Sequence, residues 1–124
     1  MQPYYDAIGR DYDRTRSADF GILEQLKTLL PVEQDKRYLD IACGTGNYTI
    51  QMAGTGGHWF AFDQSEQMLA DARRKSDEVD WRCYDVSALG YPAAYFDGAI
   101  CTLALHHFPN LSAAIVEISR VLKS

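Results

Sequence analysis

The sequence lacks the features that mark several large classes of protein. It has three cysteines and no C-x-x-C pair, so neither a disulfide framework nor a zinc cluster is indicated. We expect Cys43, Cys83 and Cys101 to be reduced core residues. The longest uncharged apolar run, residues 98–105, is far shorter than the roughly 18 residues that cross a bilayer, and no signal-like segment opens the chain. These absences predict a cytoplasmic protein without a membrane span.

Positive charge is also scarce. Twelve Lys and Arg residues stand against 17 Asp and Glu residues, which gives a formal net charge of −5. Binding to DNA or RNA depends on neutralising phosphates with a basic surface, so this balance argues against a nucleic-acid partner. The 124 residues suffice for one domain, which at this size buries roughly two thirds of the surface of its unfolded chain.

The most informative segment that is present covers residues 38–47, Y-L-D-I-A-C-G-T-G-N. A short apolar strand containing Asp40 leads into a turn with Gly44 and Gly46, and a helix start follows. Glycine has no Cβ, so it can adopt positive φ and let a ligand lie against the main chain. The segment therefore predicts a site for a nucleoside cofactor.

The glycine turn departs from the dinucleotide fingerprint G-x-G-x-x-G, because Thr49 stands at the third glycine position. Asp40 would repel a pyrophosphate but can receive an ammonium group. Asp63 ends the next predicted strand, 17 residues after Gly46, where a carboxylate can accept ribose hydroxyls. Both NAD and S-adenosylmethionine contain ribose, so Asp63 alone does not choose between them.

Apolar spacing and turn residues predict alternating helices and strands. We expect helices over residues 4–14, 18–30, 47–54, from 65 onward and through 111–122, and strands over 37–42, 58–62, 79–84 and 96–102. Ser65 is the expected N-cap of its helix. Such alternation is typical of an α/β fold with a mainly parallel sheet and right-handed crossovers.

Four blocks of sequence in this order resemble the small-molecule class I S-adenosylmethionine-dependent methyltransferases, close to their ubiquinone/menaquinone-biosynthesis-like branch. They are residues 40–49 (D-I-A-C-G-T-G-N-Y-T), 62–69, 95–108 and 117–123 (E-I-S-R-V-L-K), and residues 4–16 resemble the opening segment of that branch. The resemblance implies a Rossmann-like three-layer sandwich with N-terminal helices, strand order 3-2-1-4, and one cofactor-binding domain over residues 1–124. Family members continue into further strands, so we expect those C-terminal strands to be absent from a truncated or naturally short chain.

The resemblance also implies a set of cofactor-binding residues. They are Tyr12, Arg16, Asp40, Ala42, Gly44, Gly46, Asp63, Gln64, Met68, Asp85, Val86, Thr102 and Leu103. The glycine turn, Asp40 and the carbonyls that follow the fourth strand would face the methionine part. Asp63 would face the ribose, and Asp85 with the Val86 amide would face the adenine.

Some of these residues have ordinary structural alternatives. Met68 suits the core equally well, Asp85 suits a turn cap, and Arg16 suits a solvated helix surface. His106 is the candidate general base, because the pKa of histidine suits proton transfer, with packing or polar capping as its alternative. The histidines have no companion ligands at metal spacing, so no metal-binding residues are predicted.

The predicted function is methyl transfer from S-adenosylmethionine to a small-molecule acceptor, with S-adenosylhomocysteine as product. The sulfonium makes the methyl carbon electrophilic, so the protein mainly aligns the reactants and excludes water. The alternatives are a non-catalytic module that binds either form of the cofactor, and an NAD-binding Rossmann protein, which Thr49 and Asp40 disfavour. An unpaired edge on the fourth strand would further predict a homodimer.

Overall fold

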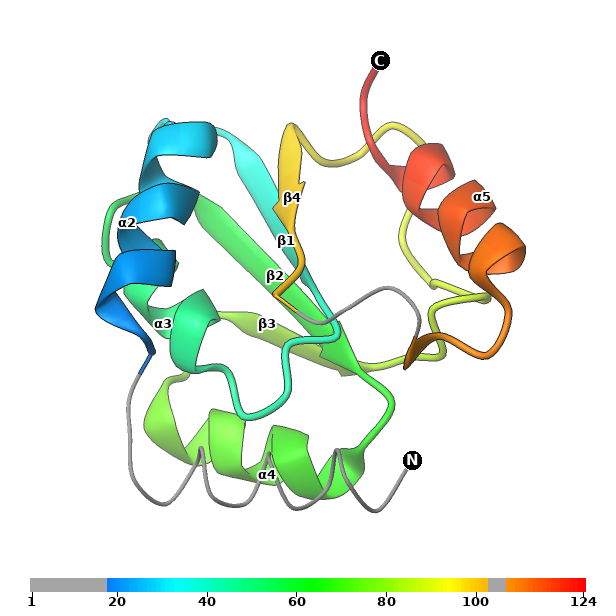
Figure 1. Ribbon diagram of the computed structural model, residues 1–124, viewed down its shortest axis with the longest axis horizontal. Coiled ribbons are helices and arrows are strands. Elements are labelled where there is room, and N and C mark those ends of the chain that lie inside the picture. Colours follow the sequence, from blue (N-terminus) through cyan, green and yellow to red (C-terminus); the bar gives the residue numbers. More distant parts are fainter. Residues whose placement is uncertain (1–17, 103–106) are drawn as a thin grey trace.

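The computed structural model describes residues 18–102 and 107–124, and it contains a four-stranded sheet with the order β3-β2-β1-β4 (Figure 1). The strands are β1 (Arg37–Ile41), β2 (His58–Asp63), β3 (Asp80–Cys83) and β4 (Gly98–Ile100). All three neighbouring pairs are parallel. The predicted α/β class and strand order are confirmed, whereas the predicted helix over residues 4–14 lies outside the described residues.

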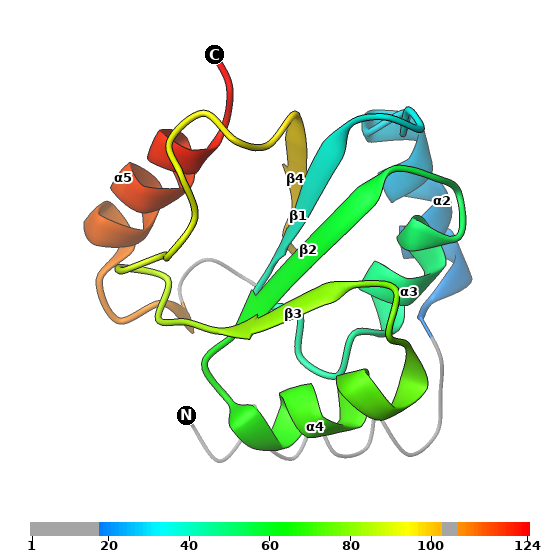
Figure 2. The same cartoon turned by 180° about the vertical axis from the view of Figure 1, so that it is seen from behind.

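Helices cover both faces of the sheet, as the two opposite views show (Figures 1 and 2). The helices on one side are α2 (Phe20–Leu29), α3 (Asn47–Ala53) and α4 (Glu66–Lys75), and α5 (Leu111–Val121) lies on the other side. Alternate residues of β1 enter the two cores, because side chains of a strand point to opposite faces. Tyr38 packs in the α2–α4 core, and Leu39 and Ile41 pack in the α5 core.

Side-chain caps begin three of the helices where the local sequence predicts a start. Asp19 accepts from the Ile22 amide at 3.0 Å, Ser65 from the Met68 amide at 3.2 Å, and Asn110 from the Ala113 amide at 3.0 Å. The predicted Ser65 cap is confirmed. The helix predicted over residues 18–30 is slightly shorter, since Asp19 is its cap and Leu30 follows its last turn.

Two sequence-based predictions need correction. The fourth strand was expected over residues 96–102 but spans only Gly98–Ile100, because Phe96 pairs with Leu122 instead and the Asp97 carboxylate caps the Arg37 amide at 2.9 Å. Cys83 is exposed, so its predicted core position is wrong. It lies at the end of β3, which is an edge strand of the sheet.

Over the part of the chain that the structure describes, none of the helices has the length and apolar character needed to cross a bilayer.

Candidate functional site

The glycine turn joins β1 to α3 at the carboxyl edge of the sheet. Ala42, Gly44 and Gly46 all have positive φ, at 55°, 60° and 83°. The turn is attached to β2 by the Cys43 amide, which donates to the Phe62 carbonyl at 2.9 Å. A tight turn with left-handed backbone is therefore present where the sequence predicts one, and Ala42 adopts a conformation that non-glycine residues rarely take.

The two glycines of the turn do different things. Among the described atoms, a Cβ on Gly44 would have one near neighbour, the Met68 sulfur at 3.7 Å, which is an ordinary van der Waals distance. A Cβ on Gly46 would lie 2.5 Å from the Trp81 ring of β3, and Gly46 is also the N-cap residue of α3. Within the described part of the chain, the backbone at Gly44 is thus loosely packed, whereas Gly46 leaves room for the Trp81 ring.

Asp63 connects the end of β2 to the glycine turn. Its Oδ2 accepts from the Gly44 amide and its Oδ1 from the Ser65 amide, both at 2.9 Å. The side chain is buried, and this burial raises the pKa of the carboxyl group while the backbone hydrogen bonds oppose the rise. Each carboxylate oxygen can accept more than one hydrogen bond, so the group can still receive hydroxyl donors.

Asp40 lies on β1 and is 1% exposed. Its Oδ2 accepts from the Thr49 hydroxyl at 2.5 Å, and its Oδ1 has no hydrogen-bond partner among the described residues. Burial raises the pKa of Asp40 to about 7, the Thr49 hydrogen bond opposes this rise, and the Asp63 charge adds to it. A buried acceptor without a partner is costly, so the Oδ1 atom suits a donor that a ligand brings.

The Asp40–Thr49 contact is absent from the sequence-based predictions, which treat Thr49 only as the missing third glycine. In the structure the Thr49 side chain is fully buried on α3 and directs the Asp40 carboxylate. The available signal was a hydroxyl in the first turn of a helix that follows an acid-bearing strand.

Asp85 and Val86 follow β3, the next strand of the sheet. Asp85 is exposed, and its Oδ1 accepts from the Ser87 amide at 2.9 Å and from the Ser87 hydroxyl at 2.6 Å. These bonds lower the pKa of Asp85. Val86 is buried, in the α5 core. The structure thus shows Asp85 as a turn cap, which is its alternative interpretation. Both capping contacts go to Oδ1, and Oδ2 takes no part in them.

The remaining predicted residues divide into two groups. Gln64 and Thr102 are exposed at the ends of β2 and β4, and Met68 of α4 is half-buried, with its sulfur beside Gly44. The other predictions, Tyr12, Arg16, Leu103 and the candidate base His106, lie outside the described residues. Within residues 18–102 and 107–124, no group of three or more His, Cys, Asp or Glu side chains is placed to hold a metal ion.

Lys75 is a contact of the glycine turn that the sequence reasoning missed. Its Nζ, at the end of α4, donates to the Thr45 carbonyl at 3.2 Å and to the Asn47 Oδ1 at 2.8 Å. The basic end of α4 is expected from the helix dipole alone. The structure adds that one of these cations holds the turn between its two glycines.

We compared the chain with protein-family models and with curated proteins. The family model described as "Methyltransferase domain" matches residues 39–124. The chain is 32% identical to the biotin biosynthesis bifunctional protein BioHC of Cellvibrio japonicus, over 90% of this chain and 23% of that protein. It is 29% identical to the 2-phytyl-1,4-naphtoquinone methyltransferase of Synechococcus elongatus, over 99% of this chain and 59% of that protein. The chain therefore spans less than two thirds of the length of either relative.

Solved structures share the architecture. An S-adenosylmethionine-dependent methyltransferase from Mesorhizobium loti superposes with a TM-score of 0.71 at 27% sequence identity. The superposition covers 81% of this chain and 47% of that protein. The Rossmann-like arrangement of β1 to β4 and their helices is thus shared with a longer protein.

Proposed function

Because the chain belongs to the class I S-adenosylmethionine-dependent methyltransferase family, we propose that it binds this cofactor at the glycine turn and transfers its methyl group to a small-molecule acceptor. The observation that carries the proposal is the buried Oδ1 of Asp40, which has no hydrogen-bond partner among the described residues. The strand that bears it leads into the glycine turn, where a Cβ on Gly44 would meet only the Met68 sulfur among the described atoms. A buried carboxylate beside a glycine turn fits a nucleoside that carries an ammonium group. It does not fit a diphosphate, because the two negative charges would repel each other.

The roles of the residues follow from their contacts. Asp40, directed by Thr49, would receive the ammonium group of the methionine part through Oδ1. Asp63 would accept the ribose hydroxyls while its present bonds keep Gly44 and the start of α4 in place. The Oδ2 of Asp85 would accept the adenine amine, since the Ser87 contacts use Oδ1.

When bound, S-adenosylmethionine supplies an electrophilic methyl carbon, so the protein needs no covalent nucleophile. The chain's part is to orient the cofactor and the acceptor and to exclude water. Tyr12 and Arg16 as a cover over the cofactor, the Leu103 carbonyl as an ammonium acceptor, and His106 as a general base stay predictions. All four residues lie outside the described part of the chain.

The acceptor that we propose to test first is a substituted naphthoquinol. This choice is supported by the naphthoquinone named for the Synechococcus relative, which aligns with 99% of this chain. The Cellvibrio relative is named for biotin biosynthesis, so a second panel should contain carboxylic acids.

Titration calorimetry with S-adenosylhomocysteine and with NAD, in parallel, tests the cofactor. We expect binding of S-adenosylhomocysteine and none of NAD, and the opposite result would overturn the proposal.

Incubation with methyl-labelled S-adenosylmethionine and the acceptor panel then tests transfer of the methyl group. Tight cofactor binding without labelling of any acceptor would favour the non-catalytic module.

We also propose a homodimer formed at the free edge of β4, and a cytoplasmic location. The dimer is supported by the pairing of Gly98–Ile100, which among the described strands have β1 as neighbour on one side only. Unpaired strand edges favour association with another chain. Fractionation of cells that express the tagged protein would test the location.

A further inference from the structure

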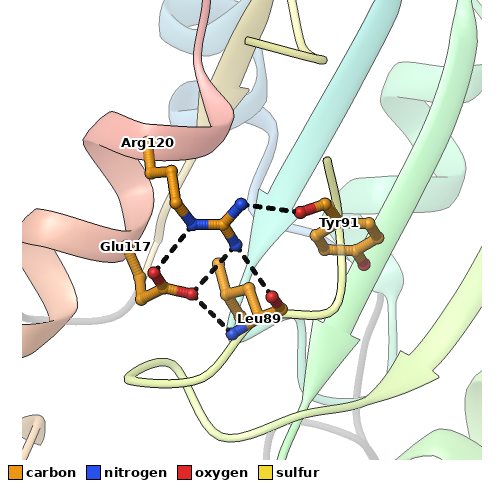
Figure 3. Close-up of polar contacts among 4 residues, drawn as sticks. All are labelled: Leu89, Tyr91, Glu117 and Arg120. Carbon is orange, nitrogen blue, oxygen red and sulfur yellow. Dashed lines mark hydrogen bonds and ion pairs between the residues drawn. The ribbon is translucent and has the colours of Figure 1, made fainter. Parts of the chain in front are cut away.

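Two side chains of α5 attach this helix to the segment that follows β3 (Figure 3). The Oε1 of Glu117 accepts from the Leu89 amide at 2.8 Å. Arg120 donates to the Leu89 carbonyl at 2.8 Å and to the Tyr91 carbonyl at 2.9 Å. Both residues belong to the E-I-S-R-V-L-K block, which the proposed function leaves without a role.

The two side chains also hold each other. Arg120 Nε lies 2.8 Å from Glu117 Oε2, and its Nη2 lies 3.0 Å from Glu117 Oε1. Hydrogen bonds between ionised groups are shorter and stronger than neutral ones, and a two-pronged guanidinium contact also fixes direction. The pair thus satisfies the amide and the carbonyl of Leu89 together, as a neighbouring strand would.

The segment is also held from its other side. A Cβ on Gly90 would lie 2.5 Å from the Tyr84 hydroxyl oxygen, and the rings of Tyr84 and Tyr91 meet edge to face at 5.2 Å. Leu89 and Tyr91 are buried in the α5 core. Residues 89–91 are therefore confined between the Tyr84 ring and α5.

This attachment lies directly beside the proposed adenine contacts. The Ala88 amide donates to the Asp85 carbonyl at 2.9 Å, which closes a turn that ends one residue before Leu89. Val86, within that turn, packs in the same core as Leu89 and Ala114 of α5. The turn that begins at Asp85 is thus held by β3 at one end and by the contacts of Leu89 at the other.

We propose that Glu117 and Arg120 are positioning residues, which hold residues 85–91 so that Asp85 and Val86 select an adenine ring in the cofactor. This inference rests on the proposed function, since it gives the same site its base specificity. Neither side chain is proposed to touch the cofactor.

The test compares the binding of S-adenosylhomocysteine with that of its inosine analogue, in which a carbonyl oxygen replaces the adenine amine. For the wild type we expect roughly tenfold or greater preference for the adenine form, which is typical of one hydrogen bond to a charged group. Arg120→Met should remove most of that preference and leave the affinity for the inosine analogue within about twofold. Arg120→Lys keeps one charged donor and should give an intermediate preference.

The matched control is Arg73→Met, which removes a guanidinium from the exposed pair with Glu66 on α4 and should leave the preference unchanged. If Arg120→Met fails to fold, Gly90→Ala displaces the same segment from the Tyr84 side and should reduce the preference alike. Equal weakening of both ligands, or an unchanged preference, would overturn the inference. Failure of the wild type to bind S-adenosylhomocysteine would instead overturn the proposed function.

Discussion

The carboxyl group of Asp40 lies where a negative charge is costly. It is buried on β1, and its Oδ1 has no hydrogen-bond partner among the described residues. The negative charge of the buried Asp63 carboxyl raises the pKa of Asp40 further. Buried carboxyl groups with a strongly raised pKa are common at functional sites. In this site the cost would be offset when the ammonium group of the cofactor arrives.

The first prediction concerns the pH dependence of folding. The pKa of Asp40 is raised from 3.8 to about 7 in the folded protein, so its unfavourable ionisation lowers the free energy of unfolding as pH rises from about 4 to about 7. At about 1.4 kcal/mol per pKa unit, the upper limit of this loss is about 4 kcal/mol. Asp40→Asn should therefore gain stability relative to the wild type across this range.

Urea unfolding at pH 4.5, 6 and 8, without ligand, measures the effect. The buried carboxyl of Asp63 contributes with the same sign, because its pKa is also raised, but it is present in both proteins. Two parallel stability profiles would contradict the assignment to Asp40.

The second prediction concerns Asp63. Asp63→Ala should weaken the binding of S-adenosylhomocysteine by about 1.5–3 kcal/mol, the range for hydrogen bonds to a charged group. The matched control is Asp19→Ala, which removes a carboxylate that caps α2 and should cost about 1 kcal/mol of stability without changing the affinity. Calorimetry on both variants decides, and an unchanged affinity in Asp63→Ala would remove this residue from the site.

Among the secondary-structure elements, the junction of β1 and α3 is the most constrained. Gly46 caps α3 at a φ of 83° and lies against Trp81 of β3, and Lys75 at the end of α4 holds the carbonyl of Thr45. The glycine turn is therefore supported by β2, β3 and α4 together. Such support would keep the proposed binding surface in place before the cofactor arrives.

The third prediction tests this packing. Gly46→Ala should lower the free energy of unfolding by about 2–4 kcal/mol, because the new Cβ would overlap the Trp81 ring at a φ that alanine rarely adopts. The control Gly54→Ala makes the same change at the end of α3, where φ is −66°, and should be neutral or stabilising by about 0.4–1 kcal/mol. Equal urea midpoints for the two variants would show that Gly46 is not a packing residue.

At the scale of the whole molecule, the sheet separates two hydrophobic cores, and the proposed site uses residues from both sides of the sheet. Asp40 points toward α3, as its bond to Thr49 shows, whereas Val86 and Leu89 belong to the α5 core. The proposed methionine and adenine contacts therefore depend on different sides of the sheet. A variant that loosens α5 should change recognition of the base more than recognition of the amino acid.

The fourth prediction concerns assembly. Sedimentation velocity over a range of concentrations should show a dimer, because β1 is the one neighbour of β4 among the described strands and an unpaired strand edge favours association. Val116→Lys serves as a control, since this residue is 65% exposed on α5 and not on β4. A monomer at every concentration would contradict the prediction, and loss of the dimer in the control would move the interface to α5.

Local chemistry in the sequence was sufficient for the elements and for the turn. The Ser65 cap, the glycine turn, and the alternation of strands with helices each depend on residues close together in the chain. The strand order came from the family resemblance. These features could be predicted because their physical causes, backbone conformation and helix-end hydrogen bonding, act over a few residues.

Only the folded chain decided what each predicted residue touches. The sheet brings Trp81 against Gly46, Lys75 against Thr45, and Arg120 against Leu89, across separations of 35, 30 and 31 residues. Such contacts leave no periodic pattern in the sequence, because they depend on how strands and helices pack and not on spacing along the chain. For the same reason the sequence could indicate Asp40 as a candidate site residue and Thr49 as a nearby hydroxyl, but only the folded chain shows that the two side chains meet.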